Sequence, residues 1–211
     1  MSDSKPTTPA ATALRSPFAS IQPHRRADRQ GQVQVQLHAE GLSSVVQIST
    51  WMGGTQALCA ALAEAVAATD LFPLPASTGQ TLQSALGLLM RTGPNEFLLI
   101  GENTPPLDLL RQHVTPEIGA VLDLSHARCR VHVKGPKAVE ALGKLFALDF
   151  REAAFAIGHV KLTGHHHVPC SIYRAEQQSF DLYLFSTYAR GQLESLQDAA
   201  LEYGVELTLG E

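Results

Sequence analysis

The chain has 211 residues, of which 45% are hydrophobic and 17% charged, so it is long enough to bury one large core or two smaller ones. Its net charge is -4 and its pI about 6.1, which argues against a nucleic-acid binder, since that class usually presents a basic face. Cys59, Cys129 and Cys170 lie far apart, as expected for free thiols in a reducing compartment. The sequence has no apolar run of about 18 residues, which would predict a membrane span, and no secretory signal is recognised. We therefore expect a cytoplasmic protein.

The first 30 residues differ in composition from the rest of the chain. They are rich in Ser, Thr, Pro, Ala and Gln, and a basic patch lies at His24, Arg25, Arg26 and Arg29. Such a segment has too little apolar surface to offset the entropy that it would lose on ordering. We therefore predict that residues 1–30 form a flexible arm, with the alternative that the arm orders on a partner subunit.

The rest of the chain shows one order of predicted elements twice. Alternation of apolar and polar residues indicates strands, and apolar residues at helical spacing indicate helices. In the first half, strands are predicted at 32–38, 44–51, 86–90, 97–100 and 120–124, and helices at 56–68 and 107–113. In the second half, strands are predicted at 128–134, 157–163, 168–174, 180–185 and 205–209, and helices at 137–148 and 189–203.

Each half therefore runs strand, helix, two or more strands, helix and strand. This order is typical of the split β-α-β, or ferredoxin-like, arrangement. The halves share the order of their elements but no evident sequence identity. We predict an α+β fold of two tandem ferredoxin-like split β-α-β units, residues 31–124 and 125–211, preceded by the flexible arm.

The stretch from Val121 to Phe150 joins the two predicted units. Its residues 128–134, R-C-R-V-H-V-K, alternate in polarity and predict a half-buried strand. Gly135 and Pro136 then end the strand and begin a helix, because a proline in the first helical turn loses no hydrogen bond. The stretch carries no clear nucleophile motif or phosphate loop, so packing is its expected role.

Four polar residues of this stretch, Asp123, Ser125, His126 and Arg128, include the residue types of a hydrolytic triad. Triad members meet across a fold and are rarely neighbours in sequence, and no G-x-S-x-G motif is present. We expect Asp123 and Ser125 to satisfy backbone donors in a turn instead. Because G-x-G-x-x-G and G-x-x-x-x-G-K-[ST] motifs are also absent, we do not expect this chain to bind a nucleotide cofactor.

His165, His166 and His167, followed by Cys170, offer imidazole and thiol groups of the kind that bind zinc. Adjacent side chains of a strand point to opposite faces, and zinc sites usually have two spaced pairs of ligands. We therefore predict a solvated polar hairpin with its turn at Gly164-His165. A metal site built through a tight turn, or a pH-sensitive or substrate-facing role, remains as the alternative.

Seven short motifs follow one another between about residues 86 and 205. They are R-T-G-P-N-E-F-L-L-I at 91–100, D-L-S-H-A-R at 123–128, K-G-P-K-A at 134–138, L-D-F at 148–150, A-F-A-I-G at 154–158, F-D-L-Y-L at 180–184 and A-L-E-Y-G at 200–204. In this order they resemble the gamma subunit family of heterotetrameric sarcosine oxidase. The resemblance implies a fold related to the folate-binding aminomethyltransferases of the glycine cleavage system, with the two units forming one gamma-type domain.

The resemblance also implies a role within a complex. Complexes of this family oxidise the N-methyl group of sarcosine to yield glycine, pass the one-carbon unit to tetrahydrofolate and reduce oxygen to peroxide. This chain would be a structural subunit beside alpha, beta and delta subunits, with no catalytic, cofactor-binding or metal-binding residue of its own. FAD, FMN, NAD, tetrahydrofolate and zinc are expected on the other subunits. Asp123, Ser125, His126 and Arg128 then become candidates for a subunit contact.

The chain departs from the family pattern at several points. Phe97 stands where Trp is usual, residues 144–146 replace a common Lys-Gly-Cys, residues 186–188 match loosely, and about the first 80 residues match poorly. These differences leave two alternatives. The first is the equivalent subunit of a related dehydrogenase of an N-methyl amino acid, such as N-methylglutamate. The second is a stand-alone folate-binding protein like the aminomethyltransferases, in which Asp123 or Asp181 would face the pterin.

Overall fold

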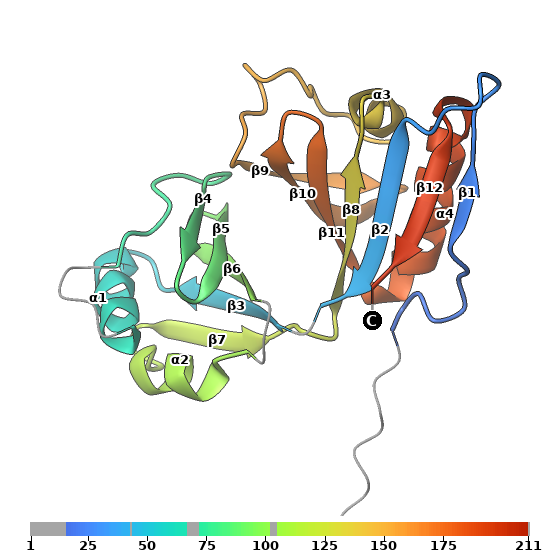
Figure 1. The fold of residues 1–211 in the computed structure, drawn as a ribbon. Coiled ribbons are helices and arrows are strands. Elements are labelled where there is room, and N and C mark those ends of the chain that lie inside the picture. Colours follow the sequence, from blue (N-terminus) through green and yellow to red (C-terminus); the bar gives the residue numbers. More distant parts are fainter. Residues whose placement is uncertain (1–15, 43, 67–71, 102–104, 211) are drawn as a thin grey trace, which may run out of the picture.

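The computed structural model describes residues 16–42, 44–66, 72–101 and 105–210, which form two β-sheets and four α-helices (Figure 1). The larger sheet has the strand order β1-β12-β2-β8-β11-β10-β9. Its strands are β1 (His24–Arg26), β2 (Val35–Gly41), β8 (Arg128–Lys134), β9 (Val160–His165), β10 (Val168–Glu176), β11 (Ser179–Phe185) and β12 (Val205–Leu209). Neighbouring strands are antiparallel except β12 and β2, which run parallel.

The smaller sheet has the order β4-β5-β6-β3-β7, and all of its neighbours are antiparallel. Its strands are β3 (Ser44–Thr50), β4 (Thr81–Ser84), β5 (Gly87–Gly93), β6 (Glu96–Gly101) and β7 (Gly119–Asp123). The helices are α1 (Thr55–Ala65), α2 (Leu107–His113), α3 (Ala138–Gly143) and α4 (Ala189–Ala200), with short 3-10 turns at Ser186–Tyr188 and Leu201–Tyr203.

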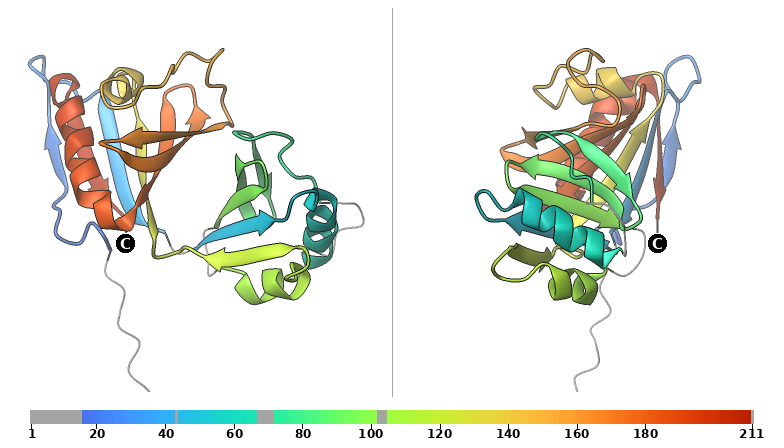
Figure 2. Two further views of the ribbon diagram at one scale, coloured as in Figure 1. Left: turned by 180° about the vertical axis from the view of Figure 1, so that it is seen from behind. Right: turned by 90° about the vertical axis from the view of Figure 1, so that its left-hand side faces the viewer.

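The larger sheet buries one face under α3 and α4, which come to the front when the molecule is seen from behind (Figure 2, left). Because side chains alternate along a strand, Leu37, Val131 and Leu182 all point to this face and are at most 1% exposed. Leu142 of α3 and Leu193 of α4 pack against them. The alternation in these strands therefore specifies a single core between sheet and helices.

The smaller sheet uses both of its faces. One face packs with α1 and α2 around Ile48, Phe97 and Leu110. The other carries Met90, which lies in a third cluster together with Tyr183 of the larger sheet. The two sheets therefore share a hydrophobic contact, and it lies on the β9, β10 and β11 side of the larger sheet.

The predicted α+β class is confirmed, and the predicted order of strands and helices agrees closely with the structure. The division into units of 31–124 and 125–211 stays a prediction, and one strand pairs across it. β2 pairs with β8 and β12 of the larger sheet, although it lies within the first predicted unit. Along the chain, the smaller sheet is thus inserted between β2 and β8. Val35, Leu37 and Ala39 of β2 complete the core under α3 and α4, which explains why β2 belongs to the larger sheet.

The predicted arm falls partly on residues 1–15, which lie outside the described residues. Residues 16–30 differ from the prediction. Phe18 is 1% exposed within the larger core, and β1 pairs with β12 through His24 and Leu207. The buried Phe18, the partly buried Ile21 and a short edge strand thus anchor a segment whose overall composition is polar.

Two further differences concern the helices. The helix predicted at 137–148 ends at Gly143, and the chain continues to Phe150 without regular structure. The helix predicted at 56–68 corresponds to α1, which ends at Ala65. Residues 67 and 68 of that prediction lie outside the described residues. Among the described residues, no helix is long and apolar enough to span a bilayer.

Candidate functional site

The turn between β7 and β8 contains the predicted contact residues. The Asp123 carboxylate accepts hydrogen bonds from the Ser125 hydroxyl at 2.6 Å and from the Ser125 backbone amide at 2.9 Å. The Ser125 hydroxyl in turn accepts the Val45 amide at 3.1 Å. These bonds hold the pKa of Asp123 below its usual value, the Ser125 hydroxyl contributing most. Asp123 therefore satisfies a backbone donor in the turn, as the sequence predicted, whereas the donor that Ser125 satisfies lies in β3.

A hollow of about 440 Å³ lies beside this turn. Asp123, Ser125 and His126 line it together with Asp108 and Arg111 of α2. Arg128 is not among its lining residues: its guanidinium lies over the Phe185 ring, 3.6 Å from the centroid. Burial lowers the pKa of Arg128, as expected for a cation held against an apolar surface. The structure thus brings three of the four predicted residues to one hollow and packs the fourth at the base of β8.

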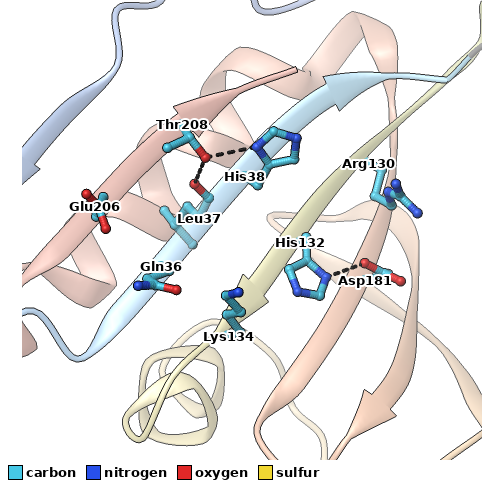
Figure 3. Close-up of a pocket in the computed structure, with 9 residues that line it drawn as sticks. All are labelled: Gln36, Leu37, His38, Arg130, His132, Lys134, Asp181, Glu206 and Thr208. Atoms are coloured by element: carbon cyan, nitrogen blue, oxygen red, sulfur yellow. Dashed lines mark hydrogen bonds and ion pairs between the residues drawn. The ribbon is translucent and has the colours of Figure 1, made fainter. Parts of the chain in front are cut away.

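A second hollow, of about 590 Å³, lies on the side of the larger sheet opposite α3 and α4 (Figure 3). The smaller sheet packs on this side near β9, β10 and β11, through Val160, Tyr173 and Tyr183. Residues of the smaller sheet also line a neighbouring hollow together with Glu40 of β2, Arg130 of β8 and Asp181 of β11. The lining residues of the second hollow are Gln36, Leu37, His38, Arg130, His132, Lys134, Asp181, Glu206 and Thr208.

Charged pairs lie along this open face. His132 Nδ1 and Asp181 Oδ1 are 2.7 Å apart across β8 and β11, and Arg130 Nε donates to Glu40 of β2 at 2.6 Å. Arg25 of β1 lies 3.9 Å from Glu206 of β12. Asp181 is only 8% exposed, so its charge is held in a partly desolvated setting.

Ser179, His132 and Asp181 have the connectivity of a hydrolytic triad. The Ser179 hydroxyl lies 3.3 Å from His132 Nε2, and Asp181 orients the other ring nitrogen. A nucleophile must also be reachable and must face donors for the oxyanion. Ser179 is 6% exposed and does not line the hollow. The three residues are therefore a hydrogen-bonded row that fixes the orientation of His132.

Most residues of this face were not singled out from the sequence. The alternation of residues 128–134 does place Arg130, His132 and Lys134 on one side of a strand, and that pattern was the available signal. It does not reveal that this side stays open, because that depends on where the smaller sheet docks. Asp181 was considered from the sequence only as a carboxylate that could face a pterin.

The histidine hairpin differs from its prediction. Its two-residue turn is His166-His167, with φ of 48° and 65°, rather than Gly164-His165. His165 is 2% exposed and packs on Phe146 with the ring centroids 5.4 Å apart, so it is not solvated. In the described part of the chain, no three His, Cys, Asp or Glu side chains are grouped so that they could hold a metal ion.

Comparison with solved structures first defines the class of fold. The glycine cleavage system aminomethyltransferase T from Bartonella henselae aligns with a TM-score of 0.60 over 93% of this chain and 60% of its own, at 14% identity. At this identity the likeness shows a shared aminomethyltransferase-like fold and nothing about activity. No family model matches the chain.

Relatives then identify the family. The gamma subunits of sarcosine oxidase from Corynebacterium sp. strains U-96 and P-1 are 30% identical over 141 residues and 31% identical over 149 residues. These alignments cover 66% and 70% of this chain and 69% and 71% of the relatives. A chain of the heterotetrameric sarcosine oxidase from Corynebacterium sp. U-96, solved in complex with pyrrole 2-carboxylate, aligns with a TM-score of 0.76 at 26% identity, over 91% of this chain and 97% of that one. The chain belongs to the sarcosine oxidase gamma subunit family.

Proposed function

We propose that the chain is the gamma subunit of a heterotetrameric sarcosine oxidase that demethylates sarcosine oxidatively to glycine and transfers the one-carbon unit to tetrahydrofolate. The main support for this proposal is the structural match to a chain of the heterotetramer. The match spans 91% of this chain and 97% of the other. In this complex the chain is a structural subunit, and alpha, beta and delta subunits are its partners in the cytoplasm.

The cofactors of the complex are proposed to lie on the other subunits. FAD, FMN, NAD and tetrahydrofolate supply the redox and one-carbon chemistry there, and zinc is held by a partner. The residues that this chain would contribute to assembly are Asp123, Ser125, His126 and Arg128, with Asp123 and Ser125 fixing the turn that presents the other two.

Purification from the native host tests the proposal directly. A tagged version of the chain should retain larger flavin-containing subunits through gel filtration, and the complex should oxidise sarcosine. A chain that purifies alone, with no flavoprotein attached, would contradict the proposal.

The same preparation separates the two alternatives. Oxidation of N-methylglutamate but not sarcosine would assign the chain to the related dehydrogenase. The aminomethyltransferase-like fold is the observation behind the folate-binding alternative. Calorimetry with tetrahydrofolate and the isolated full chain tests it, since binding by this chain alone would favour a folate-binding protein over a structural subunit.

A further inference from the structure

The hollow on the open face of the larger sheet is unusually rich in charge. Arg130, Lys134, Asp181 and Glu206 line it, together with two histidines. Cores of subunit interfaces are depleted of charged residues, so this composition does not favour a subunit contact. Its volume of about 590 Å³ falls in the range of small-molecule sites, roughly 300–1,000 Å³. A site lined in this way suits a small ligand that itself carries charge.

Two opposite charges in the hollow have capacity for further bonds. The Asp181 carboxylate accepts one hydrogen bond from His132, whereas a carboxylate offers about four acceptor positions. Lys134 lies at the exposed end of β8 and forms no ion pair with any residue that the structure describes. Arg130 Nε donates to Glu40, and burial, which lowers the pKa of Arg130, is outweighed by the nearby charges of Asp181 and Glu40, which raise it. Glu206 lies 3.9 Å from Arg25. The Asp181 carboxylate and the Lys134 ammonium group, which carry opposite charges, therefore have capacity left for bonds to a ligand.

The sheet register sets the spacing of these two groups. His132 lies opposite Asp181 and Lys134 lies opposite Ser179, so Lys134 is the diagonal neighbour of Asp181. The backbone positions of diagonal neighbours in antiparallel strands are roughly 7–8 Å apart, and their side chains extend from there into the hollow. The amino nitrogen and carboxylate oxygens of an α-amino acid are about 3 Å apart, so one hydrogen bond of about 2.9 Å at each end spans about 8–9 Å. The flexible stem of Lys134 can take up the remaining difference.

We propose that this hollow binds a small zwitterion of the amino-acid class. Asp181 accepts the ligand's ammonium group, and Lys134 binds its carboxylate. The Gln36 side chain, beside Lys134 on β2, is placed to donate to the same carboxylate (Figure 3). His132 does not bind the ligand in this arrangement; its bonds to Asp181 and Ser179 hold the carboxylate in place. No bond is made or broken at the site, so the chain keeps its non-catalytic role.

Titration of the isotope-labelled full chain with glycine, followed by amide and side-chain NMR shifts, tests the site. Shifts should map to β2, β8 and β11, and they should saturate in the millimolar range expected for so small a ligand. Acetate and methylammonium, which each carry one of the two charges, should bind at least about tenfold more weakly. The assay needs no partner subunit, so failed co-purification and failed glycine binding are separate results.

Two substitutions make the test specific. Asp181→Asn and Lys134→Met should each weaken glycine binding by about tenfold, a loss typical of one charged hydrogen bond. Asp198→Asn on α4 and Lys161→Met on β9 are matched controls at exposed positions and should leave binding unchanged. Lys134 is itself exposed, so its variant should fold even where Asp181→Asn does not. No saturable shift by glycine, equal binding of acetate, or unchanged binding by a folded Lys134→Met variant would overturn the proposal.

Discussion

His165 is a buried histidine at the end of β9, beside the turn to β10. Three consecutive histidines suggest a solvated hairpin, yet the left-handed turn at His166 and His167 directs only those two outward. His165 instead lies beneath the end of the α3 segment against Phe146. Neither of its ring nitrogens has a hydrogen-bond partner among the described residues. A neutral ring is favoured there, because a buried charge without a partner is costly.

This setting makes the stability of the chain depend on pH. Burial, with a smaller contribution from His166, lowers the pKa of His165 below its usual value of 6.5. As pH falls below 6.5, the unfolded chain therefore takes up the proton before the folded chain does. The stability that His165 contributes is fully present above 6.5 and is lost as pH falls toward the lowered folded-state pKa.

Replacement of His165 by Leu should remove this dependence. Between pH 7 and pH 5, the free energy of unfolding of the wild-type chain should fall more steeply than that of His165→Leu, by up to about 1.4 kcal/mol per pH unit. Urea denaturation at a series of pH values measures both slopes. His167→Asn is the control, since Asn tolerates the left-handed turn conformation and the residue is exposed. Parallel slopes for wild type and His165→Leu would show that His165 does not titrate on unfolding.

At the scale of elements, the corner between β8 and α3 depends on one glycine. Gly135 has a φ of +129°, a conformation that residues with a Cβ rarely adopt. A Cβ built there would lie 2.3 Å from the backbone oxygen of Gln34. Gln34 is the residue immediately before β2. The corner thus brings β8 and β2 into register while Pro136 starts the turn toward α3. This is the physical reason for the Gly-Pro pair at which the sequence predicted the end of a strand and the start of a helix.

Gly135→Ala should destabilise the fold by about 2–4 kcal/mol, because it combines backbone strain with a steric clash. Gly143, at the end of α3, provides the contrast, since a Cβ there would meet nothing within 4 Å. Gly143→Ala should stabilise the fold by about 0.4–1 kcal/mol by restricting the unfolded chain. Denaturant midpoints of the two variants measure the difference. Equal midpoints would mean that the corner relaxes around a side chain.

The elements themselves were largely predictable from the sequence, because each is specified by local periodicity. β8 matches its predicted bounds of 128–134, and α2 matches 107–113. β1 and β4 were missed, since neither three residues nor the sequence T-L-Q-S gives a periodic signal. The pairing of β2 with β8 and β12 was also out of reach, because it joins residues far apart in the chain.

At the scale of the whole molecule, the two sheets meet in several places. They share the cluster that contains Met90 and Tyr183, Gln80 forms a β-bridge with His159, and the turn from β7 to β8 joins them. The predicted contact residues lie on that turn, so a partner bound there would touch both sheets at once. The open face with His132 and Asp181 lies elsewhere on the larger sheet, and only the fold shows that the sequence patterns of β2, β8 and β11 converge there. Assembly and ligand binding are therefore assigned to separate surfaces.

The role of the turn in assembly can be tested at Arg128. Its guanidinium stacks on Phe185, so Arg128→Ala removes both a positive charge and a planar contact beside the turn. We expect the variant to weaken association with the partner subunits by about tenfold, a change within the range of one partly desolvated cation–π contact. The Michaelis constant of the complex that still forms should stay unchanged, since this chain is proposed to be structural. Gel filtration and sarcosine oxidation by the purified complex measure the two quantities.

Three comparisons separate assembly from folding. Arg190→Ala removes an exposed arginine that pairs with Glu194 on α4, and it should leave assembly intact. The thermal midpoint of the isolated Arg128→Ala chain shows how much of any loss comes from the fold, because the stacked arginine also covers Phe185. Arg128→Lys keeps the charge but loses the planar stack, so it should fall between wild type and Arg128→Ala. Intact assembly together with a changed Michaelis constant would instead place Arg128 in contact with the catalytic machinery of the complex.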